Sequence, residues 1–286
     1  MNGAQRIGKN PAKEYGPLSA KPSIAARFGF VKEVWQYREL FYFFILRDIK
    51  VRYKQTVLGA LWAVIQPFAT MIVFTIFFGK FAKMPSEGVP YPVFSYSALV
   101  PWTFFSAAVG SSGNSLIGNS ELLTKVYFPR FAIPASAALS GLMDFFIASI
   151  ILFGIMIYYS IPLSWNLLLW PVLVIPLIIL SLGLGMVFSS LNVKYRDIKY
   201  TIPFIIQILL FVTPIIYPIS ILPEKYQRIS AINPLTGIIE AFRATVIPDK
   251  HIDFVLLSFS IAVSLVIFFL GLAYFRNTEK EFADIV

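Results

Sequence analysis

The sequence predicts an all-α integral membrane protein with six transmembrane helices and both termini in the cytosol. Hydrophobic residues make up 57% of its 286 residues and charged residues only 14%, whereas soluble proteins have about 45 to 50% and about 25%. The apolar residues stand in long uncharged blocks, unlike the short, periodically interrupted runs of a soluble core. Lys and Arg gather between these blocks, mainly on one side of the predicted topology.

Composition also argues against several kinds of function. The formal net charge is +9, but the basic residues stand between apolar blocks, and no polar domain is left to carry a nucleic-acid-binding face. The chain has no Cys, and its single His, His251, lies in a polar stretch that we interpret as a solvated loop. We therefore expect no nucleic-acid partner, no metal site and no cofactor in this chain.

The N-terminal part is predicted to stay outside the hydrocarbon core. Residues 1–30 are rich in Gly, Pro and Lys and contain no apolar run, so we expect a flexible cytosolic leader rather than a signal peptide. In residues 31–57 apolar side chains fall on one helical arc and charged side chains on the opposite one. This pattern predicts an N-terminal amphipathic helix that lies in the membrane interface.

Six later stretches are long enough to cross a bilayer, and with the interfacial helix they make one transmembrane domain, residues 31–286. The fifth stretch is the shortest, and its three prolines should bend it. The expected spans are residues 58–79, 94–118, 131–160, 167–191, 201–218 and 254–275.

The long segment between the last two spans, residues 219–253, is expected on the outer side. Most Lys and Arg lie in the N-terminal region, in the loops 119–130 and 192–200 and in the C-terminal tail, and basic loops stay in the cytosol. A structureless loop as long as this segment is unusual. We expect one or two short re-entrant helices in it, and an amphipathic helix resting on the outer surface is the alternative.

The sequence lacks an energy source of its own. It has no phosphate-binding loop of the form GxxxxGK[ST]. Asp144 is the only acid well inside a predicted span, and it could pair with a neighbouring polar group, line a substrate path or couple an ion. One acid without basic partners in the spans makes a poor proton relay, so we expect the energy to come from another subunit.

Residues 119–130 predict a short helix on a cytosolic loop. Asn119 or Ser120 can cap it, Glu121 suits its first turn, and Pro129 stops it. Such a helix could dock a partner ATPase, or it could be a plain connection.

Aromatic residues are abundant, at 16% of the chain. Most are expected in interfacial belts and on lipid-facing surface. Some in the first two spans could instead line a conduit and stack on sugar rings, since such contacts are numerous and individually weak. With Asp144, the candidate lining residues are Trp62, Phe68, Phe74, Phe78, Trp102, Phe104 and Phe105.

Several blocks, in this order, resemble one known family. They are RDIKVRYKQTVLGALWAVIQP (47–67), LLTKVYFPR (122–130), NVKYRDIKY (192–200), TPIIYP (213–218) and NPLTGIIEAFR (233–243). The chain resembles the ABC-2 type permeases that export polysaccharides, most of all the O-antigen permeases, with teichoic acid and capsule exporters as relatives. The resemblance covers roughly residues 31–275.

The resemblance implies a bacterial inner-membrane exporter in which two permease copies pair with two ATPase subunits, which bind ATP and Mg²⁺. Its substrate would be a lipid-linked glycan, typically on undecaprenyl diphosphate. Residues 119–130 would be the coupling helix, and residues 219–253 would match the outer re-entrant helices. The contact residues would be Glu121, Leu122, Leu123, Lys125, Val126, Tyr127 and Phe128, and the cations near the cytosolic entrance would be Arg47, Lys50, Arg52 and Lys54.

Each of those four cations could equally anchor the chain to anionic headgroups. Other functions are also open: an ABC-2 exporter of drugs or small lipids, an ATP-independent flippase, and a membrane-embedded transferase. A flippase would need further buried ionisable residues or two similar halves, and a transferase would need clustered carboxylates, His or metal ligands. The sequence shows none of these features.

Overall fold

The computed structural model describes residues 32–54, 59–125, 128–280 and 282. The expected leader, residues 1–30, lies outside them. The chain divides into two units, residues 1–38 and 39–286. Of the first unit a short helical stretch at 32–36 is described, and the Arg38 guanidinium donates a hydrogen bond of 3.2 Å to the Trp35 carbonyl.

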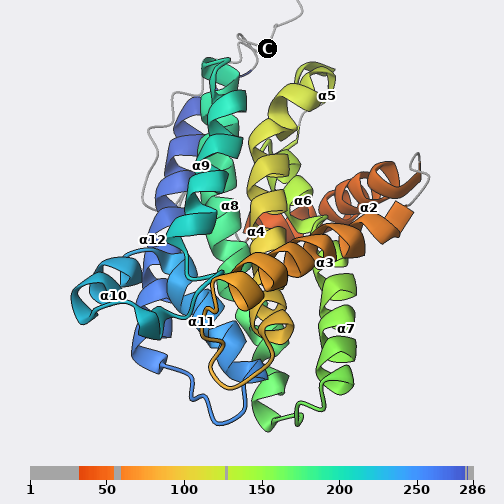
Figure 1. Cartoon of the computed structure of the whole chain (residues 1–286). Helices are drawn as coiled ribbons and strands as arrows, with labels where there is room; N and C mark the ends of the chain where they lie inside the picture. The colour runs from red at the N-terminus through yellow and green to blue at the C-terminus, as the bar shows by residue number, and fades with distance from the viewer. Residues whose placement is uncertain (1–31, 55–58, 126–127, 281, 283–286) are drawn as a thin grey trace, which may run out of the picture. The chain divides into compact units, whose positions relative to one another are not determined.

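The described residues form helices and connecting turns, with no strand among them. Turns and shorter helices connect the long helices (Figure 1). The α-helices are α2 (Arg38–Lys54), α3 (Trp62–Phe74), α4 (Tyr91–Gly118), α5 (Ser120–Lys125), α6 (Ala132–Leu139), α7 (Leu142–Tyr158), α8 (Trp170–Lys194), α9 (Ile198–Val212), α10 (Glu224–Ala231), α11 (Pro234–Val246) and α12 (Phe254–Thr278). The shorter elements are η1 (Gly59–Leu61), the π-helix η2 (Thr75–Phe81), η3 (Trp165–Leu169) and η4 (Ile219–Ile221).

Five helical segments within the described residues are long and apolar enough to cross a membrane. Helix α9 is apolar too, but its 15 residues extend only about 22 Å. The five segments are Trp62–Phe81, Tyr91–Gly118, Ala132–Tyr158, Trp165–Lys194 and Phe254–Thr278.

Helix α9 ends at Val212, six residues before the end of the expected span 201–218. Thr213 has an extended backbone, with φ −85° and ψ 138°, because the residue before a proline is pushed out of the helical region by Pro214. The backbone stays non-helical through the TPIIYP block, so the carbonyl groups that follow α9 need donors from elsewhere.

The third apolar segment is interrupted between α6 and α7, at Ser140 and Gly141. The Ser140 hydroxyl donates to the carbonyl of Ala137 at 2.9 Å, and Gly/Ser pairs are common sites of helix kinks. Asp144 therefore lies in the first turn of α7, rather than deep inside one continuous helix.

Helix α4 is the most buried of the membrane-length segments. It packs against α3, α6, α7, α8 and α11, and its contacts with α8 include a close approach at Gly185, where an added Cβ would lie 2.3 Å from the Ser112 hydroxyl. Helices α8 and α12 also meet closely, because a Cβ on Gly271 would lie 2.4 Å from the Gly183 carbonyl oxygen. Small residues that let backbones approach are typical of helix packing in membranes.

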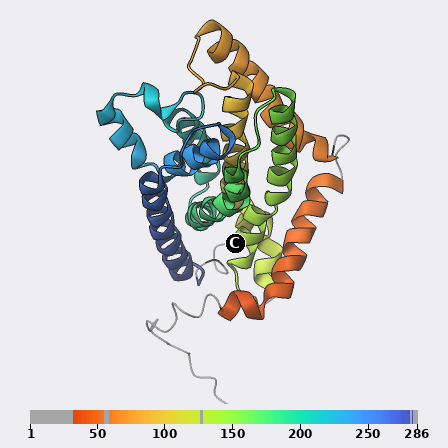
Figure 2. The same ribbon diagram turned by 90° about the horizontal axis from the view of Figure 1, so that it is seen from below.

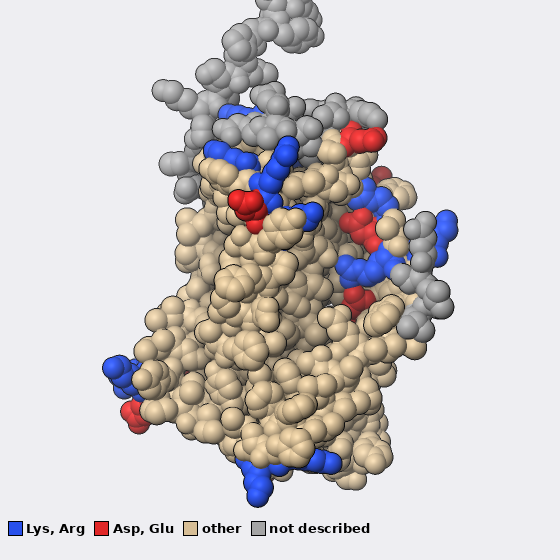
Figure 3. Space-filling model, turned by 45° about the horizontal axis from the view of Figure 1, so that its top comes forward, with Lys and Arg blue, Asp and Glu red and all other residues tan. Residues whose placement is uncertain are grey.

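Helix α2 runs across the direction of α4 and α7 (Figures 1 and 2). Its buried residue is Phe41, while Tyr42 and Phe43 are exposed. On the face drawn in Figure 3, charged side chains gather towards the two ends and leave a broad uncharged band between them. This distribution fits a protein whose middle lies in hydrocarbon.

Candidate functional site

The predicted docking helix is present as α5, and a single residue, Asn119, separates it from the end of α4. The Asn119 carbonyl accepts a hydrogen bond of 3.0 Å from the backbone of Leu122. The Asn119 side chain instead turns back to α4 and donates to the Ser115 carbonyl at 2.8 Å. Glu121 lies in the first turn of α5, as its sequence position predicts.

Of the other predicted coupling residues, Leu123 and Lys125 belong to α5, and Val126 and Tyr127 fall outside the described residues. Phe128 is buried, and its ring lies 5.4 Å from that of Phe44 on α2. The chain that follows α5 therefore packs on α2 through aromatic rings. The coupling role of these residues stays a prediction.

Arg52 and Asp144 form an ion pair between α2 and α7, with Arg52 Nη1 2.5 Å from Asp144 Oδ2. The Arg52 guanidinium also lies 3.4 Å from the Ser140 hydroxyl, and the Tyr53 hydroxyl donates to Asp144 Oδ1. Burial and this hydrogen bond raise the pKa of Tyr53, so its phenol stays protonated as a donor. Pairing of Asp144 with a polar neighbour was one of the three roles considered from the sequence.

The remaining predicted entrance cations lie apart from Asp144. Arg47 pairs with the adjacent Asp48 at 2.8 Å, while Lys50 and Lys54 are exposed. All three border one groove of about 530 Å³ on α2, together with apolar residues of the same helix. The structure thus divides the four cations into Arg52, held by Asp144, and three that line a basic groove.

The aromatic residues proposed for a conduit differ in exposure. Phe104 and Phe105 are buried, whereas Trp62 is 54% exposed. Phe104 packs against Phe145 at a centroid distance of 5.9 Å. Their place in a conduit stays a prediction. The remaining candidates are Phe68, which is exposed, Phe78, which is half-buried, and Phe74 and Trp102, which are buried.

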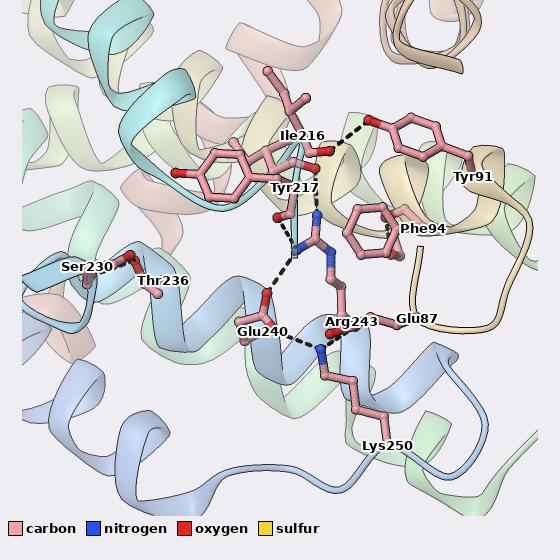
Figure 4. Close-up of polar contacts among 12 residues, drawn as sticks. Glu87, Tyr91, Phe94, Ile216, Tyr217, Ser230, Thr236, Glu240, Arg243 and Lys250 are labelled. Carbon is pink, nitrogen blue, oxygen red and sulfur yellow. Dashed lines mark hydrogen bonds and ion pairs between the residues drawn. The ribbon is translucent and has the colours of Figure 1, made fainter. Parts of the chain in front are cut away.

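A buried group of charges that sequence reasoning missed lies at the other end of the helices from α5 (Figures 1 and 4). We call Glu87, Glu240, Arg243 and Lys250 the outer charge cluster. Arg243 has no exposed surface, and its Nη1 lies 2.8 Å from Glu240 Oε1. Lys250 bridges the two acids, with its Nζ 2.6 Å from Glu240 and 2.5 Å from Glu87. Two cations thus face two carboxylates in a mostly buried site.

The outer charge cluster also holds the segment that follows α9. Arg243 donates to the carbonyl of Ile215 at 2.5 Å and to that of Tyr217 at 3.3 Å, and the Tyr91 hydroxyl donates to the carbonyl between them, of Ile216, at 2.7 Å. Three consecutive carbonyls of the non-helical segment after α9 thereby receive side-chain donors. The guanidinium also lies 3.8 Å from the centroid of the Phe94 ring, a cation–π contact.

A sequence signal for this cluster existed. Glu240 and Arg243 are spaced i, i+3 in an otherwise apolar helix, PLTGIIEAFR, and residues so spaced share one helix face. The partners Glu87 and Lys250 lie on separate loops, and nothing in the local pattern links them to α11. Among the described residues no group of His, Cys, Asp or Glu is placed to hold a metal ion.

Comparison with known proteins gives consistent matches over most of the chain. The sequence model of the ABC-2 type transporter family matches residues 39–247. The O-antigen export system permease protein RfbA of Myxococcus xanthus is 28% identical over 257 residues, which cover 89% of this chain and 98% of the relative. RfbA of Klebsiella pneumoniae is 28% identical over 244 residues, which cover 84% of this chain and 92% of the relative.

A capsule-type relative matches as well. The polysialic acid transport protein KpsM of Escherichia coli is 29% identical over 267 residues, covering 89% of this chain and 98% of the relative. The family match spans well over half of the chain, and the structure supplies the apolar helices that such a protein needs. The chain therefore belongs to the ABC-2 type transporter family and is an integral inner-membrane permease homologous to polysaccharide export permeases.

Proposed function

We propose that this chain is the membrane subunit of an ATP-driven exporter that moves a lipid-linked polysaccharide outward across the inner membrane. The observation that carries the proposal is the end-to-end similarity to relatives named for O-antigen export and for polysialic acid transport. O-antigen-like glycan is the first substrate class, and capsule-type glycan is the second, favoured by the KpsM relative.

In the proposed topology α9 is the sixth crossing, and both termini lie in the cytosol. The supports are the clustering of basic residues near α2, α5 and the loop 195–197 and the apolar character of α9. Helix α11 would be re-entrant from the outside, because its 13 residues extend only about 20 Å and twelve of them are buried.

The proposed assembly contains two copies of this chain and two ATPase subunits, which bind ATP and Mg²⁺. Helix α9 supports the pairing of two copies, since most of its exposed side chains are apolar and need a cover other than water, although Lys199 and Gln207 are exposed as well. The apolar ones include Phe204, 63% exposed, and Phe211, 56% exposed. A second copy, the exported chain or lipid would cover them.

At the cytosolic end the basic groove on α2 would receive the carrier's diphosphate. Arg52 is neutralised by Asp144, whereas Lys50 and Lys54 are exposed at the groove and free to turn towards a phosphate. Charge-assisted contacts of this kind are short and strong. Arg47 borders the groove too but pairs with Asp48, so Lys50 and Lys54 are the predicted entrance cations that remain without a carboxylate among the described residues.

The coupling role of α5 can be tested with Leu123→Asp, with Thr124→Asp as a control that places the same charge on the next residue. If the apolar face of α5 grips the ATPase, Leu123→Asp abolishes ATP-dependent export while the permease remains folded and inserted, and Thr124→Asp has the smaller effect. Export assays in proteoliposomes, with the amount of inserted permease measured in parallel, give the comparison. Normal export by Leu123→Asp would remove the coupling assignment.

A further inference from the structure

A groove lies between α3 with η2 on one side and α7 on the other, with Pro92 of α4 also in its wall. Its volume is about 790 Å³, and its walls are almost wholly apolar, with Met71 and Ile151 among them. Helices α3 and α7 are neighbours (Figure 2), and the groove is the space that their side chains leave open. A space of this size and character on the membrane-facing part of a protein calls for an apolar occupant.

The length of the groove matches one leaflet of a bilayer. It extends from Phe68 to Lys80, thirteen residues along α3 and η2, whose twelve steps correspond to about 18 Å at the rise of an α-helix. Half of a hydrocarbon core of about 30 Å is about 15 Å. An acyl chain that follows the groove would therefore run from near mid-membrane to the headgroup level.

One end of the groove has the chemistry of a headgroup site. Lys80 lies there with Tyr158 and Tyr159, and within the described residues no carboxylate is within ion-pair distance of Lys80. Tyr side chains place an apolar ring in hydrocarbon and a hydroxyl at the interface. A phosphate would supply the negative charge that this lysine lacks.

The wall of the groove is also left open at Gly154 on α7. A Cβ added there would meet no heavy atom within 4 Å. At Gly183 and Gly271, by contrast, a neighbouring helix backbone fills the space. The facing wall includes the π-helix η2, and such segments are frequent at functional sites.

We propose that this groove binds an anionic glycerophospholipid, with one acyl chain along α3 and α7 and the phosphate at Lys80. The site is separate from the basic groove on α2 and from the outer charge cluster. It does not depend on the identity of the exported substrate. The bound lipid completes the packing between α3 and α7.

The test is a titration of delipidated permease, without ATPase, by phosphatidylglycerol and by phosphatidylethanolamine, with bound lipid counted by native mass spectrometry. Lys80→Gln should weaken phosphatidylglycerol binding about fivefold, the effect of one basic residue near an anionic headgroup, and remove the preference over phosphatidylethanolamine. Gly154→Leu should weaken binding of both lipids, because its side chain occupies the acyl path. Lys225→Gln on α10 and Gly118→Leu at the end of α4 are the matched controls.

Thermal unfolding of each variant separates loss of the site from loss of the fold. The proposal is overturned if Lys80→Gln keeps the phosphatidylglycerol preference or if Gly154→Leu binds both lipids like the unaltered protein. Stronger binding of undecaprenyl phosphate than of phosphatidylglycerol would assign the groove to a carrier lipid and contradict it. Since the native chain has no Cys, a disulfide-linked dimer formed through Gly154→Cys would show that a second copy covers the groove, which also contradicts it.

Discussion

Arg243 connects more parts of the molecule than any other residue of the outer charge cluster. It lies on α11, pairs with Glu240, and donates to the carbonyls of Ile215 and Tyr217 beyond the end of α9. The side chain thus fixes the non-helical segment after α9 to α11.

Replacing Arg243 with Met should lower the free energy of unfolding by about 3 kcal/mol, because removing one partner of a buried pair leaves uncompensated charge. Arg243→Lys should lower the free energy of unfolding by less, because the charge is kept, although an ammonium cannot reproduce the forked contacts of a guanidinium. Thermal or denaturant unfolding in detergent measures both effects.

The double variant Arg243→Met/Glu240→Gln serves as the control for charge balance, since it leaves Lys250 and Glu87 as a neutral pair. Its loss of unfolding free energy should be smaller than the sum of the losses caused by the two single changes. Strict additivity, or an unchanged stability of Arg243→Met, would contradict the importance assigned to the cluster.

The Arg52–Asp144 ion pair between α2 and α7 can be tested by exchanging its charges. Arg52→Asp and Asp144→Arg should each reduce export, because each leaves two like charges beside one another. The exchange of both residues should restore part of the export, since the pair is re-formed with reversed polarity. Normal export by the two single variants, or less export by the double variant than by either single variant, would show that the pair does not position α2.

At the scale of elements, the apolar helices and the short helix α5 were predictable, because hydrophobic runs, caps and prolines are local signals. The interruption at Ser140 and Gly141 was not predicted, so Asp144 was expected deep within one continuous span. Asp144 lies in the first turn of α7, and its ion-pair partner Arg52 is 92 residues away in the sequence. Local periodicity carries no information about such a partner.

The burial of α11 leads to a labelling prediction. Ile238 has no exposed surface, whereas Ile229 on the neighbouring α10 is 53% exposed. A cysteine at position 238 should therefore react poorly with impermeant thiol reagents added from outside, and one at position 229 should react readily. Gly237 is unsuitable, because an added Cβ would lie 2.3 Å from the Ser260 hydroxyl. Equal labelling of the two positions would show that α11 is not covered.

At the scale of the whole molecule, two groups of ion pairs lie around α2 and around α11, and the face in Figure 3 has a broad uncharged band. The helices of this band are joined by small residues and buried aromatic rings. Composition alone was enough to predict this band, because charges are costly in hydrocarbon. The two clusters could not be predicted, since each joins segments far apart in sequence.

Reconstitution in lipid vesicles tests whether this chain is the membrane subunit of an ATP-driven glycan exporter. The permease in lipid vesicles, with and without its ATPase, is offered a fluorescently labelled undecaprenyl-linked glycan, and a Walker-lysine variant of the ATPase is the matched control. The account predicts translocation only with ATP and the active ATPase. Equal translocation without the ATPase would indicate a flippase, and ATP-dependent transport of small amphiphiles but not of glycan would indicate a drug or lipid exporter; either result would contradict the account.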